Sequence, residues 1–216
     1  MDGGYSTPAV AQAITTIAET REDCYVYLST AFEAEESANY MAAIVQYRND
    51  LMLNSSYASL FAGWVKVYDP YNQTEVWCSP VGFAAAAQAF TAEQYDMWYP
   101  AAGWNRGGFK ALDVRRRFKP GERDYLVDNQ ICPIRYKQGS GLVIWGNDTL
   151  LTIPGPFQSR HVRMLVIVIK GGVSAYLEGK FFDLNSARGR QMIVEALTQY
   201  MADEIGDGVV RFLVVS

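Results

Sequence analysis

The sequence predicts an α/β fold in which a mixed sheet is flanked by helices. Three observations favour this class: helix-like and strand-like segments alternate, half of the 216 residues are apolar, and only 19% are charged. A chain of this length buries roughly 70–75% of the surface that its unfolded form exposes, so it needs no disulfide or metal to hold a core. No internal repeat or long linker divides the sequence, and we expect a single domain over residues 1–216.

The first part of the chain is predicted to contain helix, strand, helix and hairpin in that order. Thr7 and Pro8 have the residue types of an N-cap and a first helical position, and that helix extends to about Ala18. The elements expected after it are a strand over 24–28, a helix over 37–52, a strand over 57–68, a hairpin turn over 69–72, a strand over 74–78 and a helix over 81–90. Four consecutive alanines in the last helix suit either close packing on a neighbouring layer or plain helix propensity.

The second part of the chain is less regular. We expect a helix over 122–129, a strand over 142–145, a short extended piece over 181–184 and a helix over 185–204. Residues 161–180 fit two structures: Met164–Ile169 is β-branched enough for a buried strand, whereas the whole segment is long enough for a helix that Gly171 and Gly172 weaken.

The end of the chain predicts a strong strand. Residues Val209–Val215 are hydrophobic and contain neither proline nor glycine. A strand there should seek pairing, either inside this chain's own sheet or with strands outside the chain. Val209, Phe212 and Val215 are therefore candidate interaction residues.

Charge and composition exclude several classes of partner. The net charge is −4 and the longest basic block is Arg115–Arg117, which argues against nucleic acid as the main partner. The longest apolar run, Met164–Ile169, is too short to cross a bilayer, and no signal peptide opens the sequence. Three widely spaced cysteines are typical of free thiols in a cytosolic product. The 13% aromatic content fits a filled core and a protein interface equally well.

The sequence contains no motif typical of a catalytic, metal-binding or phosphate-binding site. The single histidine, His161, lies between Arg160 and Arg163, which leaves almost no material for a zinc site or for Ser-His and Cys-His catalysis. The glycines of Gly103–Gly108 and Gly139–Gly141 lack the Gly-Lys-Ser/Thr of a phosphate loop and suit turns. Capping and solubility explain Glu33, Glu35 and Glu36 just before a helix. We expect no catalytic, cofactor-binding or metal-binding residues and no cofactor.

Arginines and one tryptophan are the remaining candidates for contacts with a partner. Arg115, Arg116 and Arg117 suit either an acidic partner surface or a solvated edge strand. Arg160 and Arg163 are candidates because arginine is enriched at protein interfaces. Trp104 lies in Tyr99-Pro-Ala-Ala-Gly-Trp-Asn-Arg-Gly-Gly-Phe109, where it would anchor the segment to the core or to a neighbour.

Several segments, in order, resemble the contractile tail sheath proteins of myovirus-type, T4-like bacteriophages. Tyr99–Gly108 is similar to the family's Pro-Ala-Gly-x-Asn-Arg-Gly, and Asn129–Ile134 to Ile-Asn-Pro-Ile with Cys132 in place of the usual Asn. Gly141–Leu150 resembles Gly-x-Val-x-Trp-Gly-x-Arg-Thr-Leu, with Asp148 in place of Arg. The other matching segments are Ser59–Pro70, Ser79–Phe83, His161–Leu165 and Phe182–Asn185. We transfer no role to Cys132 or Asp148.

The resemblance covers residues 57–216 well and 1–56 loosely. It implies the common core of a sheath subunit, truncated at both ends relative to the family. It also implies a non-enzymatic structural protein of the virion tail, assembled in the host cytoplasm. Its partners would be copies of itself in hexameric rings that stack helically, the tail tube protein, and the baseplate and tail terminator proteins.

The same resemblance implies how the subunits would work. Extended terminal arms would add strands to neighbouring sheets, and an extended sheath held by kinetics would contract without nucleotide to drive the tube through the host envelope.

Two alternatives remain open. One is the sheath of a related contractile injection system rather than of a phage. The other is a small-molecule hydrolase built on an α/β scaffold, which requires that Asp or Glu residues converge in a pocket.

Overall fold

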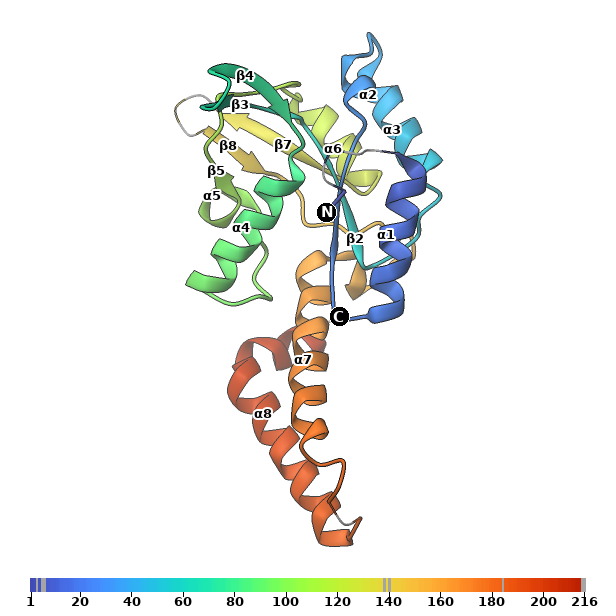
Figure 1. The fold of residues 1–216 in the computed structure, drawn as a ribbon, viewed down its shortest axis with the longest axis vertical. Helices are drawn as coiled ribbons and strands as arrows, with labels where there is room; N and C mark the ends of the chain where they lie inside the picture. The colour runs from blue at the N-terminus through green and yellow to red at the C-terminus, as the bar shows by residue number, and fades with distance from the viewer. Residues whose placement is uncertain (3, 5–6, 138, 140, 184, 215–216) are drawn as a thin grey trace. The chain divides into compact units, whose positions relative to one another are not determined.

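The computed structural model describes residues 1–2, 4, 7–137, 139, 141–183 and 185–214. Side chains are described up to residue 202. The chain divides into two compact units, Met1–Leu165 and Val166–Ser216. The larger unit holds all the described strands, and the smaller unit is helical (Figure 1).

A five-stranded mixed sheet organises the larger unit. Its order is β1-β2-β7-β8-β5, where β1 is Val26–Ser29, β2 is Ala58–Ala62, β7 is Ile131–Lys137, β8 is Gly141–Ile144 and β5 is Gly108–Phe109. The pairs β1–β2 and β2–β7 are parallel, whereas β7–β8 and β5–β8 are antiparallel. The predicted α/β class with a mixed sheet is therefore confirmed.

The core explains why β1 and β2 are continuous apolar runs. All residues of these two strands are buried, as expected for parallel strands covered on both faces. The helices α1 (Pro8–Arg21), α3 (Tyr40–Asp50) and α6 (Pro120–Asp128) contribute side chains to one core cluster with them. Helix α4 (Val81–Gln94) buries Ala84 and Ala87 and contacts β1. In Figure 1, α1 and α4 lie on different sides of β2.

A second, three-stranded sheet has the order β4-β3-β6, with β3 Val65–Asp69, β4 Thr74–Cys78 and β6 Asp113–Val114. The predicted hairpin is confirmed as the antiparallel pair β3–β4. The single strand expected over 57–68 is instead two strands in two sheets. Gly63 separates them with φ +113°, and a Cβ there would lie 2.8 Å from Cβ of Ile134. A positive φ and close packing of this kind require glycine.

The helix expected over 37–52 differs in a similar way. A short helix α2 (Phe32–Glu36) comes first, and α3 begins at Tyr40. Two more short elements, α5 (Gly103–Arg106) and the 3-10 turn η1 (Pro156–Gln158), lie in the segment that the sequence leaves irregular.

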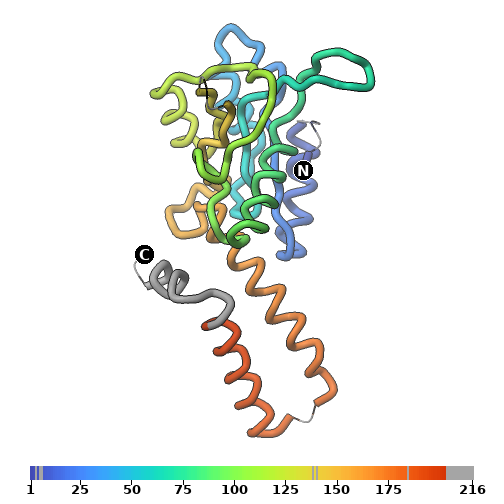
Figure 2. Tube along the Cα trace, turned by 90° about the vertical axis from the view of Figure 1, so that its left-hand side faces the viewer, coloured from blue at the N-terminus to red at the C-terminus, as the bar shows by residue number. Residues whose placement is uncertain are grey.

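The smaller unit consists of most of α7 (Arg160–Glu178) and of α8 (Ala187–Val214), and Figure 2 traces both helices and the turn between them. The ambiguous segment 161–180 is thus helical up to Glu178, and residues 179–180 form a turn. Residues 181–183 form a turn and not the extended piece that we predicted, and Leu184 lies outside the described residues.

The predicted terminal strand is wrong. Val209 and Phe212 belong to α8, which continues to Val214, and Val215 lies outside the described residues. The physical reason is that propagating an existing helix costs less than nucleating a new element, so α8 extends through Gly206 and Gly208. Strand propensity depends on packing against a partner strand, so the apolar sequence alone does not determine whether this segment forms a strand.

Candidate assembly interface

Three of the segments singled out by the sequence converge at one edge of the five-stranded sheet. Strand β5 ends the Tyr99–Phe109 segment and pairs with β8 through Gly108–Val143 and Phe109–Leu142. Strand β8 in turn pairs with β7. The amide of Trp145 donates a hydrogen bond to the carbonyl of Pro133 at 2.9 Å, so the chain beyond β8 stays attached to β7.

Two glycines allow close backbone contacts here, Gly107 inside the Tyr99–Phe109 segment and Gly146 against the Asn129–Ile134 segment. A Cβ on Gly107 would lie 2.8 Å from Cα of Ala102, and a Cβ on Gly146 would lie 2.9 Å from Cα of Cys132. Real Cβ atoms do not come that near to backbone. The close approach therefore gives a physical reason for glycine at positions 107 and 146.

Two tryptophans and two cations form a cluster beside this junction. The rings of Trp104 and Trp145 lie 6.3 Å apart, and Arg135 lies 4.3 Å from the Trp145 ring centroid and 5.3 Å from that of Trp104. Lys137 lies 5.2 Å from the Trp104 ring. Contacts of this kind are worth about 0.5–1 kcal/mol at exposed sites and hold the cations in fixed positions.

An open groove of about 370 Å³ adjoins the cluster, and we call it the motif groove. Its lining is mostly apolar or small. The residues are Pro100, Ala102, Gly103, Val127, Trp145, Gly146 and Asn147. Six of the seven come from two of the segments that the sequence analysis selected, so these segments build one surface feature.

Arg160 ties the same segments to the first turn of α7. Its side chain is only 1% exposed, and its Nη2 donates to the carbonyl of Ala101 at 3.3 Å. The guanidinium lies 5.3 Å from the ring of Phe61, and the Arg160 amide donates to the carbonyl of Asn147 at 2.7 Å. In this chain Arg160 is therefore an interior residue. An interface role for it stays a prediction.

The neighbours of Arg160 respond to its charge and to burial. Burial raises the pKa of the Asp148 carboxyl, and the Arg160 charge opposes that shift. Burial and then Arg160 lower the pKa of His161, whose Nδ1 lies 2.5 Å from Nδ2 of Asn147. The histidine thus packs beside a buried cation, which favours its neutral form.

The three consecutive arginines make contacts within the chain. Arg115 pairs with Glu36 and lies over the ring of Phe32 at 5.1 Å. Nε of Arg116 donates to the carbonyl of Glu35 at 2.6 Å. Arg117 pairs with Asp113 at 2.9 Å.

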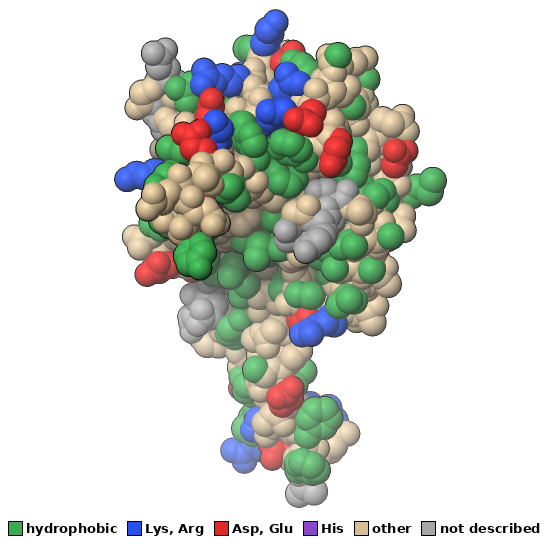
Figure 3. Space-filling model, turned by 45° about the horizontal axis from the view of Figure 1, so that its top comes forward, with side chains coloured by type: hydrophobic (Ala, Val, Ile, Leu, Met, Phe, Trp, Pro, Cys, Tyr) green, Lys and Arg blue, Asp and Glu red, His purple; other side chains and the backbone are tan. Residues whose placement is uncertain are grey.

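Figure 3 shows this intermixing of basic and acidic side chains at one end of the larger unit. The region is neither a bare basic patch nor an isolated edge strand. Contacts of these arginines with a partner remain a prediction.

Arg163 and Phe109 also pack within the larger unit. Arg163 lies between the rings of Tyr57 and Phe157, at 4.4 and 4.0 Å. The Phe109 ring packs against that of Phe83, with centroids 4.9 Å apart, so it anchors the segment to α4. Trp104 is 36% exposed, and contact of its ring with a neighbour stays a prediction. The side chains of Val209, Phe212 and Val215 are outside the described part.

Glu35 is a structural residue that the sequence analysis misread. It is fully buried, and its carboxylate accepts hydrogen bonds from the Thr30 hydroxyl at 2.8 Å and from the amides of Gly63 and Trp64 at 2.7 and 3.0 Å. Burial raises the pKa of Glu35 against these bonds. Glu35 thus fastens α2 to the bend between the two sheets. The sequence shows only an acidic run that suits a solvated helix end.

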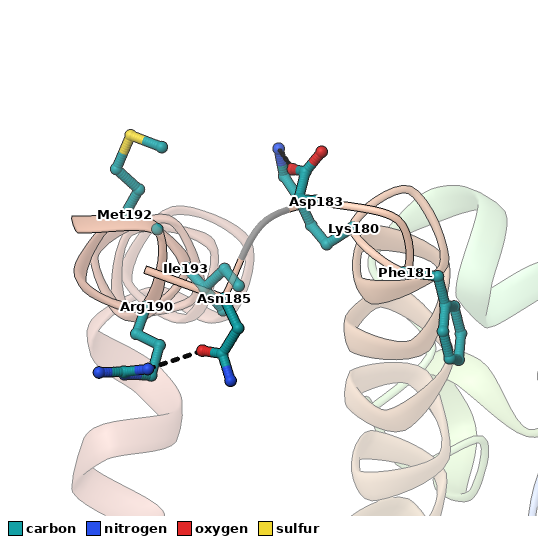
Figure 4. Close-up of a pocket in the computed structure, with 8 residues that line it drawn as sticks. Lys180, Phe181, Asp183, Asn185, Arg190, Met192 and Ile193 are labelled. Carbon is teal, nitrogen blue, oxygen red and sulfur yellow. Dashed lines mark hydrogen bonds and ion pairs between the residues drawn. The ribbon is translucent and has the colours of Figure 1, made fainter. Parts of the chain in front are cut away.

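The smaller unit has a shallow hollow of about 270 Å³ at the turn between α7 and α8. Lys180 pairs with Asp183 at 3.0 Å, and Arg190 donates to Oδ1 of Asn185 at 2.6 Å (Figure 4). Both contacts are local and fix the shape of the turn.

The described part of the chain holds neither a cluster of metal ligands nor a helix suited to span a membrane. No three His, Cys, Asp or Glu side chains are grouped so that they could hold a metal ion. Among the helices described, none combines the length and apolar character that crossing a membrane requires.

The sequence is similar to curated phage proteins named tail sheath protein. It is 26% identical over 204 residues to that of Enterobacteria phage T4, with 89% of this chain and 31% of the relative covered. It is 27% identical over 225 residues to that of Vibrio phage KVP40, with 94% and 33% covered. It is 27% identical over 193 residues to that of Salmonella phage ViI, with 88% and 31% covered. The chain therefore spans about a third of the length of these relatives. No family model matches it.

Solved structures share the fold. The sheath complex of the extracellular contractile injection system PVC, in its contracted state, aligns with a TM-score of 0.75 at 14% identity over 89% of this chain and 51% of that chain. The contracted helical sheath of the anti-feeding prophage aligns with a TM-score of 0.66 at 17% identity over 92% and 59%. A sheath tail protein from Desulfitobacterium hafniense aligns with a TM-score of 0.54 at 18% identity over 91% and 42%.

Proposed function

We propose that this chain is the core of a structural subunit of a contractile phage tail sheath and that it catalyses no reaction. One observation carries the proposal: sequence similarity to three phage tail sheath proteins extends over 88–94% of the chain. The fold shared with contracted sheath structures supports it. Two of the segments that carry the resemblance, Tyr99–Gly108 and Gly141–Leu150, line one open groove, which suits a surface for assembly.

The proposed assembly is a helical stack of hexameric rings around a tail tube, with baseplate and terminator proteins at its ends. Exchange of terminal strands would link the rings. One exchanged strand with about four or five hydrogen bonds gives roughly 2–7 kcal/mol at about 0.5–1.5 kcal/mol each. In this chain the outer edge of β1 already accepts one such bond, from the amide of Asp2 to the carbonyl of Tyr27 at 3.3 Å.

The proposed work of the sheath is mechanical. An extended sheath would be kinetically trapped, and its subunits would swing as rigid bodies when the baseplate releases them. The energy would be stored during assembly in the host cytoplasm, so contraction in the virion tail would need no nucleotide. Arg115, Arg116, Arg117 and Trp104 are our candidates for contacts between subunits.

Electron microscopy of the full-length protein tests this proposal. We expect negatively stained samples to contain tubes or stacked rings of uniform diameter, without added nucleotide. A full-length protein that stays monomeric over a wide range of concentration and salt contradicts the proposal.

A sheath of a non-phage contractile injection system is the second candidate, favoured by the PVC and anti-feeding prophage structures. The sequence matches to phage proteins are higher in identity and favour the phage tail. Capsid genes beside the gene for this chain would support the phage assignment, and toxin-loading genes would support the other.

A further inference from the structure

The turn between α7 and α8 exposes two adjacent phenylalanines. Phe182 is exposed as fully as in an extended chain, at 103%, and Phe181 is 77% exposed. Leu177, one helical turn before them, is also exposed. Large apolar groups clustered at an exposed tip are typical of surfaces that become covered in a complex.

Acidic groups flank these rings. Glu178 is exposed, and Asp183 follows Phe182 directly. Asp183 shares its charge with Lys180 at 3.0 Å, and Figure 4 shows this pair at the rim of the turn with Phe181 pointing away from Asn185 and Arg190. The tip, defined as residues 177–183, therefore offers aromatic surface with carboxylates beside it.

The motif groove has the complementary chemistry. Its lining is mostly apolar or small and includes Trp145, whose ring lies 6.3 Å from that of Trp104. Within the described part of the chain, Arg135 and Lys137 contact aromatic rings and form no ion pair with a carboxylate. The neighbouring charge of Arg135 also lowers the pKa of Arg123, after burial. A carboxylate of a partner would therefore be attracted to Arg135 and Lys137.

The sizes agree as well. An apolar cavity of about 150 Å³ is enough to bind benzene, and the motif groove measures about 370 Å³. One phenyl ring of the tip fits such a groove, with room for backbone or a second side chain.

We propose that the tip of one copy docks into the motif groove of a second copy, with Phe182 in the groove and Glu178 and Asp183 facing Arg135 and Lys137. The contact joins two different surfaces, so it is heterologous and generates rings or open helices. This inference rests on the proposed sheath function and names one contact within it.

Sedimentation velocity on the chain of 216 residues tests the docking. We expect wild-type chain to associate with increasing concentration and less strongly at high salt. Phe182→Ser and Lys137→Glu should each weaken association about tenfold or more, as loss of a central contact does. Tyr71→Ser, which changes a ring that is 92% exposed in the β3–β4 turn, and Arg21→Glu, which has the same charge change on α1, are controls that should associate normally.

Mixing the two variants gives the sharpest result. Phe182→Ser keeps an intact groove and Lys137→Glu keeps an intact tip, so an equimolar mixture should form a one-to-one dimer and no longer species. Circular dichroism confirms that each variant is folded. A monomeric wild-type chain, variants that associate normally, or a mixture that stays monomeric would overturn the docking.

The docking and the sheath proposal can fail separately. Tubes formed equally well by full-length wild-type protein and by both variants overturn the docking alone. Absence of tubes from every form overturns the sheath proposal.

Discussion

At the residue scale, charged side chains buried in the larger unit connect segments that are distant in sequence. Glu35 links α2 to the bend between the sheets, and Arg160 links α7 to the Tyr99–Phe109 segment. A buried charge that loses its partners is costly, so such positions resist substitution.

Replacing Glu35 tests its structural role. Glu35→Ala leaves the amides of Gly63 and Trp64 without acceptors, at about 1–3 kcal/mol each, so we expect the free energy of unfolding to fall by roughly 2–6 kcal/mol. Urea denaturation measures this. The matched control is Glu33→Ala, an exposed residue of the same helix, which should change stability little.

The pH dependence of Glu35 has a definite sign. Because its pKa is raised in the folded state, the folded protein keeps this proton to higher pH than the unfolded chain does. The stabilisation is fully present below the ordinary Glu value of about 4.3 and is lost as pH rises through the raised value. The stability advantage of wild type over Glu35→Gln should therefore shrink as pH increases. An advantage that grows with pH would show that the pKa is lowered instead.

Gly146 tests the close contact between two of the matching segments. Gly146→Ala places a methyl group 2.9 Å from Cα of Cys132, and we expect a loss of about 1–3 kcal/mol, typical of overpacking. Gly82→Ala is the control, since a Cβ there meets nothing within 4 Å and the site is helical. Thermal unfolding that ranks both variants alike would contradict the contact.

At the element scale, the adjacent glycines of α7 allow a comparison in nearly identical helical settings. A Cβ on Gly171 meets nothing within 4 Å, so Gly171→Ala should stabilise the helix by up to about 1 kcal/mol. A Cβ on Gly172 would lie 2.2 Å from the hydroxyl oxygen of Tyr200 in α8, so Gly172→Ala should gain less or destabilise. Thermal loss of the helical circular dichroism signal measures both. Equal gains would mean that α7 and α8 do not pack there.

Local signals predicted the elements whose patterns are self-contained. The β3–β4 hairpin follows from Asp69 and Pro70 between two strand-like runs, and α1 follows from Thr7 and Pro8. Local sequence patterns gave wrong helices or strands where packing against distant residues decides the structure. Gly63 splits a predicted strand because Ile134 packs against it. Residues 209–214 are helical because α8 propagates through them.

The interface was predictable only in part for the same reason. The matching segments contain Trp104 and Gly146; Gly146 lines the motif groove, and the Trp104 ring lies 6.3 Å from that of Trp145, which also lines it. No sequence pattern singles out Arg135 and Lys137. Their position matters because the fold brings the rings of Trp145, just after β8, and Trp104, in α5, beside β7.

At the scale of the whole molecule, two surface features bear on the proposed assembly. The larger unit supplies a buried mixed sheet with a groove at one edge, and the smaller unit supplies an exposed aromatic tip. Chemistry of this kind suits contacts between copies rather than turnover of a substrate.

Helical reconstruction by cryo-electron microscopy of assemblies of the full-length protein tests the sheath proposal most directly. We predict a hollow tube with regular helical symmetry, in which each repeating subunit contains the five-stranded sheet β1-β2-β7-β8-β5. Particles without helical or ring symmetry, or a solution of monomers under every condition, would contradict it.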